Sequence, residues 1–447
     1  MRIHFFLVSL LIFSLAGSSL AQEPWTLEKC VEYAMTNNLD IQKAGLKNQR
    51  NEENYRQSIR NLLPGLSASS GYGASFGKSI DPITNDVVYQ SFSSNSFSAS
   101  TSVSLFQGFR QLNEIAFSKN LYATGHFDEQ ALKATLSFQI MNAFYNVIFF
   151  QGLIEISDSL LEQSRWNQGY IEGMIRNGLI AESDILEVTA AVATGELKKI
   201  KSQNEYDQAL LQLKQLMNLD SGLPFIIRKE IPEIQSAIRL EHPVDSLYYQ
   251  ALRCLPEIQS TRANVQASRI NLQQAKSNFY PSLLFYAGTS TGFYQTRKDS
   301  EGNVIPFRDQ MSNNASEYLG FSLGIPIFNK GQNRSQTKLA RIQVKESELS
   351  LMQEQQKLYQ RIYQDWKKLS ALKMEINQGT KQVKALEAAE AILRKKFEKG
   401  LANQYEVSQA RNLLASARSE LLSTSLQYEI TRRTIDYYQG IPIPGMQ

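Results

Sequence analysis

The chain has 447 residues, with 47 lysines and arginines against 43 aspartates and glutamates, three histidines and 42% hydrophobic residues. This balance leaves no basic surplus, so no nucleic-acid partner is expected. The three histidines form no helical pair of metal ligands, and Cys30 and Cys254 cannot build a four-cysteine zinc site, although one disulfide between them stays open. Without a Ser-His-Asp or paired-carboxylate grouping, we predict no metal, no other cofactor and no enzyme.

Residues 1–21 have the layout of a secretory signal peptide. Arg2 precedes an apolar run from Phe5 to Leu15, and small residues lead to Ala21. The run is shorter than the ~20 residues that a spanning helix needs, which disfavours a short membrane anchor. We expect cleavage after Ala21, an exported chain and no later apolar stretch of spanning length.

The rest of the chain contains two similar halves. Ala34, Ile41, Gln42 and Pro64 match Ala251, Ile258, Gln259 and Pro281 at one constant spacing, and Phe106, Gly178 and Tyr206 match Phe328, Gly400 and Tyr428 at a slightly longer one. Constant spacing over such lengths indicates internal repetition. We predict a first repeat over 22–223, a connector over 224–243 and a second repeat over 244–447.

Each half begins with a predicted helical arm and continues as a hairpin. The arms, 27–63 and 244–280, each end before a proline. In the segment 97–105 apolar residues alternate with serines, and 66–76, 283–287 and 319–327 alternate in the same way. The hairpin tips, 78–86 and 296–314, are polar and are predicted to be exposed loops.

The two-residue period of these segments is compatible with two kinds of sheet. Apolar residues alternating with small polar ones over about ten positions are typical of a membrane barrel strand, with lipid outside and water inside. A half-buried strand of a soluble sandwich has the same period. Four such strands in an otherwise helical exported chain favour the membrane barrel.

Long helices follow each hairpin. Between Gln332 and Lys399 there is no proline and a single glycine, and 402–439 contains neither residue. From Ala410 to Tyr438 the apolar residues follow a 4-3 repeat, which predicts a seam against a neighbouring helix.

Four strands from one chain cannot close a membrane barrel. Unpaired backbone groups at an open edge cost several kcal/mol each in lipid, so the chain is predicted to oligomerise. Two copies would give eight strands and three copies twelve, and only the larger barrel is wide enough for a passage.

Short segments at the junctions and turns resemble those of a known family. They are Val103–Gly108, Ile325–Gly331, Asn177–Ala181 and Lys399–Asn403. Together they resemble the outer membrane efflux protein family, the TolC-like channels, over essentially the whole mature chain. The resemblance implies a mainly α fold with a membrane β-barrel, in which a homotrimer forms a 12-strand barrel and a 12-helix periplasmic coiled-coil tube.

The resemblance also implies a function and a location. The chain would be the trimeric exit duct of a tripartite efflux or export system in the cell outer membrane, extending into the periplasm. It would passively conduct substrates that an inner-membrane pump delivers through a periplasmic adaptor (membrane fusion) protein, and it would contact outer membrane lipid. The alternatives are the outer membrane channel of a type I protein-secretion system and a non-channel periplasmic coiled-coil scaffold.

Two groups of site residues are implied by the resemblance. The family docks its adaptor at the helix tips, which implies docking at Gly178, Leu179, Gly400 and Leu401, with a plain helix C-cap as the alternative. Beyond each turn the family often narrows its entrance with carboxylates. The matching residues here are Asp184 with Glu406 and Glu187 with Gln409. Like charges in a ring would favour cations, and solvated surface charge is the alternative.

The entrance departs from the best-known member of the family at one feature. That member latches its gate with a tyrosine and an arginine near the second turn. Phe397 and Ala402 stand in those places here, and their side chains make neither hydrogen bonds nor ion pairs. We therefore expect Phe397 at the periplasmic entrance without that polar latch.

Overall fold

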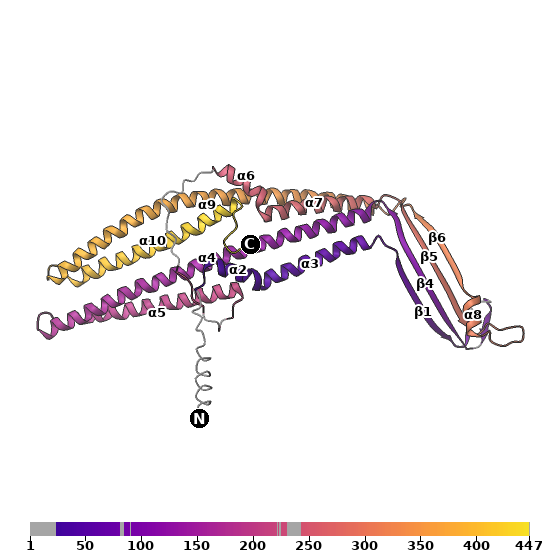
Figure 1. Cartoon of the computed structure of the whole chain (residues 1–447), viewed down its shortest axis with the longest axis horizontal. Coiled ribbons are helices and arrows are strands. Elements are labelled where there is room, and N and C mark those ends of the chain that lie inside the picture. The colour runs from indigo at the N-terminus through magenta and orange to yellow at the C-terminus, as the bar shows by residue number, and fades with distance from the viewer. Residues whose placement is uncertain are drawn as a thin grey trace, which may run out of the picture. The chain divides into compact units, whose positions relative to one another are not determined.

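The structure is a computed structural model that describes residues 24–80, 85–89, 91–220, 222, 225–229 and 243–446. The predicted signal peptide and most of the predicted connector lie outside these ranges. The element order is α2 (Leu27–Asn37), α3 (Leu39–Arg60), β1 (Gly65–Ser75), β2 (Lys78–Ile80), β3 (Val87–Tyr89), β4 (Phe92–Gln107), α4 (Arg110–Arg176), α5 (Asp184–Met217), α6 (Val244–Cys254), α7 (Pro256–Ser277), β5 (Ser282–Tyr294), α8 (Phe307–Asn313), β6 (Ser316–Gly324), α9 (Gln332–Glu398) and α10 (Gln404–Tyr438) (Figure 1).

Helices at matching places in the two halves have matching lengths. Helices α2 and α6 have 11 residues each, α3 and α7 have 22 each, and α4 and α9 have 67 each. The predicted long helices are confirmed, since α9 and α10 occupy the stretches that lack proline. The boundaries proposed for the two repeats stay a prediction.

The chain divides into two compact units. The helical unit combines 1–42, 132–251 and 360–447, and the sheet unit combines 43–131 and 252–359. Long helices such as α4 and α9 contribute residues to both units.

The core of the helical unit forms where α2, α4 and α5 meet. Its fully buried members include Ile140, Met141, Phe144, Val147, Ile148, Leu213, Met217, Cys30, Val31 and Ala34. Burial raises the pKa of the Cys30 thiol to about 12, which leaves it protonated and unreactive. No disulfide joins Cys30 to Cys254.

One expectation about apolar stretches was wrong. Helix α4 contains an 18-residue window that is apolar enough to cross a membrane by length and composition, although 50% of that window is buried inside the chain. The core residues of α4 explain its apolar composition, because Ile140, Phe144 and Ile148 pack against neighbouring helices. A single window of this kind is weak evidence for a span.

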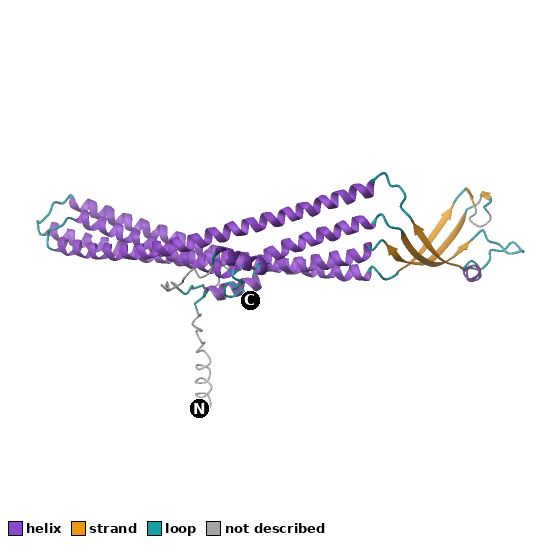
Figure 2. Cartoon of the chain, turned by 90° about the horizontal axis from the view of Figure 1, so that it is seen from above, coloured by secondary structure: helices purple, strands orange, loops and turns teal. Residues whose placement is uncertain are grey.

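Four strands form the antiparallel sheet of the sheet unit, which is orange in Figure 2. Their order is β1-β4-β5-β6, as labelled in Figure 1. In the chain, β1 and β6 are the edges of this sheet, and β2 pairs separately with β3. The register places Thr101 opposite both Leu66 and Ala287, and Ala287 opposite Leu319. The predicted strand pattern is therefore confirmed in all four strands.

Two details of the hairpins differ from the predictions. The last strand ends at Gly324 rather than continuing to Ile327, because Pro326 has no backbone N–H to donate to a ladder. The segment 296–314 is not wholly an exposed loop, since it contains α8, in which Gln310 is fully buried. Part of the other tip, 78–86, lies outside the described residues.

Candidate functional sites at the helix tips and the sheet

The turn that follows α4 ends the helix with a left-handed glycine. Gly178 has φ +71°, and its N–H donates to the carbonyl of Ile175 at 2.9 Å. The N–H of Leu179 donates to the carbonyl of Met174 at 3.0 Å. This pair of bonds is a Schellman motif, which satisfies the last carbonyls of the helix. The side chain of Leu179 remains 67% exposed.

The turn that follows α9 repeats this geometry. Gly400 has φ +72° and donates to Phe397 at 2.9 Å, while Leu401 donates to Lys396 at 2.8 Å and is 73% exposed. Apart from the adjacent residues, no described atom lies within 4 Å of the position that a Cβ would take on either Gly178 or Gly400. Glycine is therefore required here by backbone conformation rather than by space.

The predicted entrance carboxylates lie beyond these turns, in different environments. Glu406 forms a capping box: Asn403 Oδ1 accepts from the N–H of Glu406 at 2.9 Å, and Glu406 Oε2 accepts from the N–H of Asn403 at 3.1 Å. Glu187 and Gln409 are exposed. Asp184 begins α5, and its side chain lies outside the description. Glu406 therefore has a structural task at the tip, and the entrance role of these residues stays a proposal.

Phe397 belongs to an aromatic group near the tips. Its side chain is 9% exposed and its ring centroid lies 5.5 Å from that of Tyr170, which stacks on Trp166 at 5.6 Å with an interplanar angle of 8°. Because Tyr170 is on α4 and Phe397 on α9, the contact joins the two helical hairpins. The contact of Phe397 is thus between aromatic rings, and its place at an entrance stays a prediction.

A cleft of about 470 Å³ lies beside this aromatic group. It is lined by Tyr170, Ile171, Met174, Ile180, Glu187, Val188, Phe397, Gly400, Ala402, Asn403, Gln404 and Tyr405. The predicted residues Glu187, Phe397 and Gly400 are thus brought together. Within the described part of the chain, no group of three or more metal-ligating side chains occurs.

Ion pairs along each hairpin join its two helices, and sequence reasoning missed them. Arg411 Nε lies 3.0 Å from Glu390 Oε1, with the two side chains 10% and 17% exposed. Burial lowers the pKa of Arg411, and the carboxylate of Glu390 opposes that change. Arg418 and Glu387 form an exposed pair farther along the same helices. For Arg411 and Glu390, opposite charges at nearly equal distances from the turn at Gly400 are the signal that could have found the pair.

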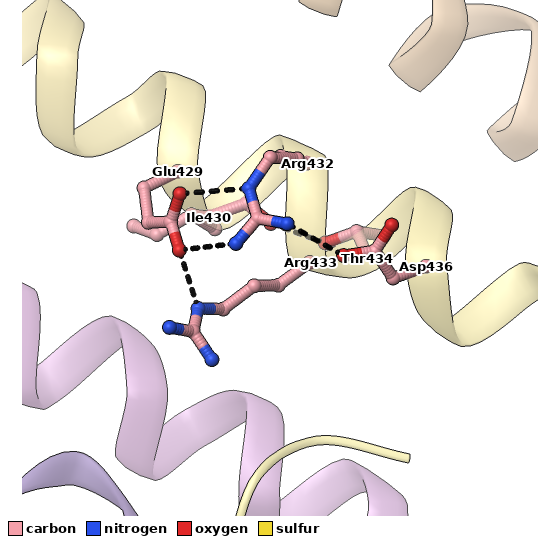
Figure 3. A network of polar contacts seen from close by, with 6 residues as sticks. All are labelled: Glu429, Ile430, Arg432, Arg433, Thr434 and Asp436. Atoms are coloured by element: carbon pink, nitrogen blue, oxygen red, sulfur yellow. Dashed lines mark hydrogen bonds and ion pairs between the residues drawn. The ribbon is translucent and has the colours of Figure 1, made fainter. Parts of the chain in front are cut away.

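A second missed feature is a charge network on α10, centred on the buried Glu429 (Figure 3). Glu429 is 5% exposed, and its carboxylate accepts from Arg432 Nε at 2.9 Å, from Arg432 Nη2 at 2.7 Å and from Arg433 Nε at 2.7 Å. Arg432 Nη1 also donates to Asp436 at 2.9 Å. The spacing of three, four and seven residues puts all four side chains near one another on the helix.

Titration of the network reflects competition between burial and pairing. Burial alone would raise the pKa of Glu429, but hydrogen bonds and charge from Arg432 and Arg433 lower it below its ordinary value. Burial raises the pKa of Tyr145 on α4 to about 12, against the opposing charge of Arg433. The network thus connects α10 to a buried part of α4.

The sheet presents two chemically different faces. The serine face carries Ser67, Ser69, Ser98, Ser100, Ser102, Tyr286 and Tyr318, and the apolar face carries Leu66, Val103, Phe285, Leu319, Phe321 and Leu323. On the serine face, Ser69 Oγ lies 2.8 Å from Ser98 Oγ across two strands. On the apolar face, the rings of Phe285 and Phe321 lie 5.3 Å apart. Such faces suit water on one side and lipid on the other.

Comparison with protein families matches residues 31–219 and 247–440 to the family described as Outer membrane efflux protein. The chain belongs to this family. The resemblance that the junctions and turns indicated is therefore confirmed. The predicted location of this outer membrane efflux protein, in the outer membrane with an extension into the periplasm, is confirmed as well.

Curated relatives of this outer membrane efflux protein are distant. Outer membrane protein TolC of Escherichia coli K12 is 23% identical, over 94% of this chain and 83% of TolC. Cation efflux system protein CusC of the same strain is 22% identical, over 90% of this chain and 83% of CusC. Alkaline protease secretion protein AprF of Pseudomonas aeruginosa is 23% identical over 68% of this chain, which spans only 61% of AprF.

Solved structures share the fold. The Campylobacter jejuni CmeC outer membrane channel superposes with a TM-score of 0.79 at 14% identity, covering 94% of this chain and 86% of CmeC. VceC of Vibrio cholerae superposes with a TM-score of 0.76 at 16% identity, covering 93% and 96%. The mostly helical fold with a small antiparallel sheet is thus the fold of known outer membrane channels.

Proposed function

We propose that this chain is one subunit of a homotrimeric outer membrane exit duct in a tripartite efflux or export system. The duct passively conducts substrates that an inner-membrane pump delivers through a periplasmic adaptor. The observation that carries the proposal is the four-stranded sheet, which has one apolar face, one serine face and two edges that pair with no other strand among the described residues. Family membership supports it.

The edges of the sheet argue for closure by several copies. In lipid, the backbone groups of β1 and β6 must find partners, and an isolated four-stranded sheet has none for them. Pairing β6 of one copy with β1 of the next joins identical subunits head to tail until the ring closes. Three copies give twelve strands and a water-filled interior lined by the serine face, whereas eight strands would be filled by side chains.

The helix tips are proposed as the docking surface for the adaptor. Leu179 and Leu401 are exposed apolar side chains, and Gly178 and Gly400 fix the turns that present them. Exposed leucines held on rigid turns can bury apolar area against a helical partner. We propose Glu187, Gln409, Asp184, Glu406 and Phe397 as residues of the periplasmic entrance.

The cargo has two candidate classes. CusC is named for cation efflux and AprF for alkaline protease secretion, and both relatives align with this chain. We therefore keep the type I protein-secretion channel as the second candidate. Deletion of the gene for this chain should sensitise cells to drugs or metal ions if the duct serves efflux. It should remove a secreted protein from the medium if the duct serves protein secretion.

The mass of the purified protein in detergent, after subtraction of the detergent, tests the proposal. We expect a value near three chains, each slightly below the full 50.6 kDa once the signal peptide is removed. A mass of two chains would keep the membrane barrel but remove most of its passage. A monomer that leaves membranes in salt or carbonate would overturn the duct and favour a periplasmic coiled-coil scaffold.

A further inference from the structure

We propose that α8 lies at the headgroup level of the outer leaflet and fixes how deeply the sheet sits in the bilayer. The inference rests on the proposed membrane barrel and names a lipid surface as the partner of a segment outside the strands. Three observations carry it: the face of the sheet on which α8 packs, the hydrogen bonds that hold α8 there, and the length of β5, which exceeds what a membrane crossing requires.

Helix α8 packs against the apolar face rather than the serine face. The ring of Phe307 lies 6.3 Å from that of Phe97 and 5.6 Å from that of Phe293. Thr291 Oγ1 donates to the carbonyl of Met311 at 2.7 Å. Phe97 and Thr291 are register partners and so share one face with Phe293. The helix therefore covers the face that is proposed to meet lipid.

Side-chain amides clamp the segment to the strand end. Gln310 is fully buried; its Nε2 donates to the carbonyls of Ile305 at 2.8 Å and Tyr294 at 3.1 Å, and its Oε1 accepts from the N–H of Tyr294 at 3.0 Å. Asn314 Nδ2 donates to the carbonyl of Gly292 at 2.6 Å. These bonds, from the middle of α8 and from its C-cap, fix its position on the sheet.

Strand length places these contacts near the boundary of the hydrocarbon. A tilted barrel strand crosses the bilayer core in about 9–11 residues, whereas β5 has 13. Counted from Ser282, which follows α7, the crossing is complete at about Gly292. Figure 1 shows α8 at the opposite end of the strands from α7. The residues that α8 contacts, Thr291 to Tyr294, are therefore at the outer boundary.

The surface chemistry changes at the same level. Toward the middle of β6, Leu319 is 75% and Phe321 63% exposed on the apolar face, as lipid-facing residues should be. At the end of the sheet that α8 covers, the ring of Phe307 is partly exposed, and the charged residues Arg308 and Asp309 that follow it are exposed as well. Charges are costly at the bilayer midplane and tolerated near its surface, whereas aromatic rings favour the interface. Headgroups satisfy both requirements.

Tryptophan fluorescence in vesicles tests the depth directly. The native tryptophans, Trp25, Trp166 and Trp366, belong to the helical unit and give a background that lipid bromines should not quench. Full-length Phe307→Trp, Phe321→Trp and Tyr318→Trp proteins are reconstituted in phosphatidylcholine brominated either near the headgroup or deep in the acyl chain. Tyr318 is the matched control, since it lies on the serine face and is 47% exposed, as Phe307 is.

We expect at least twofold stronger quenching of Phe307→Trp by shallow than by deep bromines, the reverse for Phe321→Trp, and little quenching of Tyr318→Trp. Unquenched Phe307→Trp beside quenched Phe321→Trp would put α8 in water and overturn the inference while the barrel stands. Deep quenching of Phe307→Trp would overturn it as well. An unquenched Phe321→Trp would instead refute the membrane barrel. If Phe307→Trp does not assemble to the detergent-corrected mass of the wild-type protein, Asp309→Trp, at an exposed position of the same helix, is used for the depth measurement instead.

Discussion

At the level of single residues, the two tip glycines carry the backbone conformation of the proposed docking surface. Both Gly178 and Gly400 have positive φ with open space around the Cα. A side chain there would not collide with a neighbour, but it would force an L-residue into the left-handed region. This separates conformational strain from packing and makes the glycines a clean test.

We predict that Gly178→Ala destabilises the tip by about 1–2 kcal/mol, because alanine is disfavoured at positive φ. Gly173→Ala is the matched control: Gly173 lies inside α4 with nothing near its Cα, and alanine there should stabilise the helix by up to ~1 kcal/mol. Hydrogen exchange of the tip amides measures both. Equal effects of the two substitutions would contradict the proposed role of the turn.

A second prediction concerns the buried carboxylate of Glu429. Glu429→Gln leaves Arg433 without its carboxylate partner and leaves Arg432 with Asp436 alone, which should cost about 1.5–3 kcal/mol in the free energy of unfolding through lost charge-assisted hydrogen bonds. Glu387→Gln removes the exposed partner of Arg418 on the neighbouring helix and should cost about 1 kcal/mol or less. Thermal and denaturant unfolding of both variants measures the difference, and similar losses would contradict the assigned role of burial.

The same carboxylate gives a pH dependence with a fixed sign. The folded-state pKa of Glu429 is lowered, so its contribution is fully present above the ordinary value of 4.5 and is lost as pH falls through the lowered folded-state pKa. The stability difference between wild type and Glu429→Gln should therefore shrink only in acid. A difference that stayed constant down to the lowest pH would mean that the charge is not responsible.

At the level of elements, the seam between α9 and α10 follows the predicted 4-3 repeat. Leu414 and Ala417 are buried in a cluster with Val383. We predict that Leu414→Ala costs about 2–5 kcal/mol through the cavity that it leaves. Leu413, its neighbour, is 53% exposed, and Leu413→Ala should change stability by about 0.5 kcal/mol or less. Far-UV circular dichroism during unfolding compares them, and a larger loss for Leu413→Ala would contradict the register.

The elements that sequence could predict are those with a strong period. The alternation with serine predicted which residues of β1 and β4 share a face of the sheet, and the long stretches without proline predicted α9 and α10. Helix α8 could not be found in this way, because seven polar-rich residues have no readable period and are held by Gln310 contacts to β5. The apolar window of α4 was overlooked, because burial in a helical core depends on partners that are distant in sequence.

The site residues likewise divide into those that local sequence predicts and those that depend on contacts distant in sequence. The tip glycines were predictable, since a reversal between long helices requires positive φ. The capping role of Glu406 could have been seen in the spacing from Asn403, three residues before it. The pairing of Phe397 with Tyr170 could not, because it joins two hairpins that no local pattern relates.

At the level of the whole molecule, the unlike edges of the sheet have a genetic consequence. Because β1 and β6 differ, every junction of the proposed ring needs a sound edge from each of two neighbours, and one faulty subunit breaks the closure. An allele with a proline in the middle of β6 should therefore be dominant. Expressed equally with the wild type, it should leave about one in eight rings intact. Export by such a strain, compared with one at half the normal dosage, would separate poisoning of assemblies from simple loss of copies.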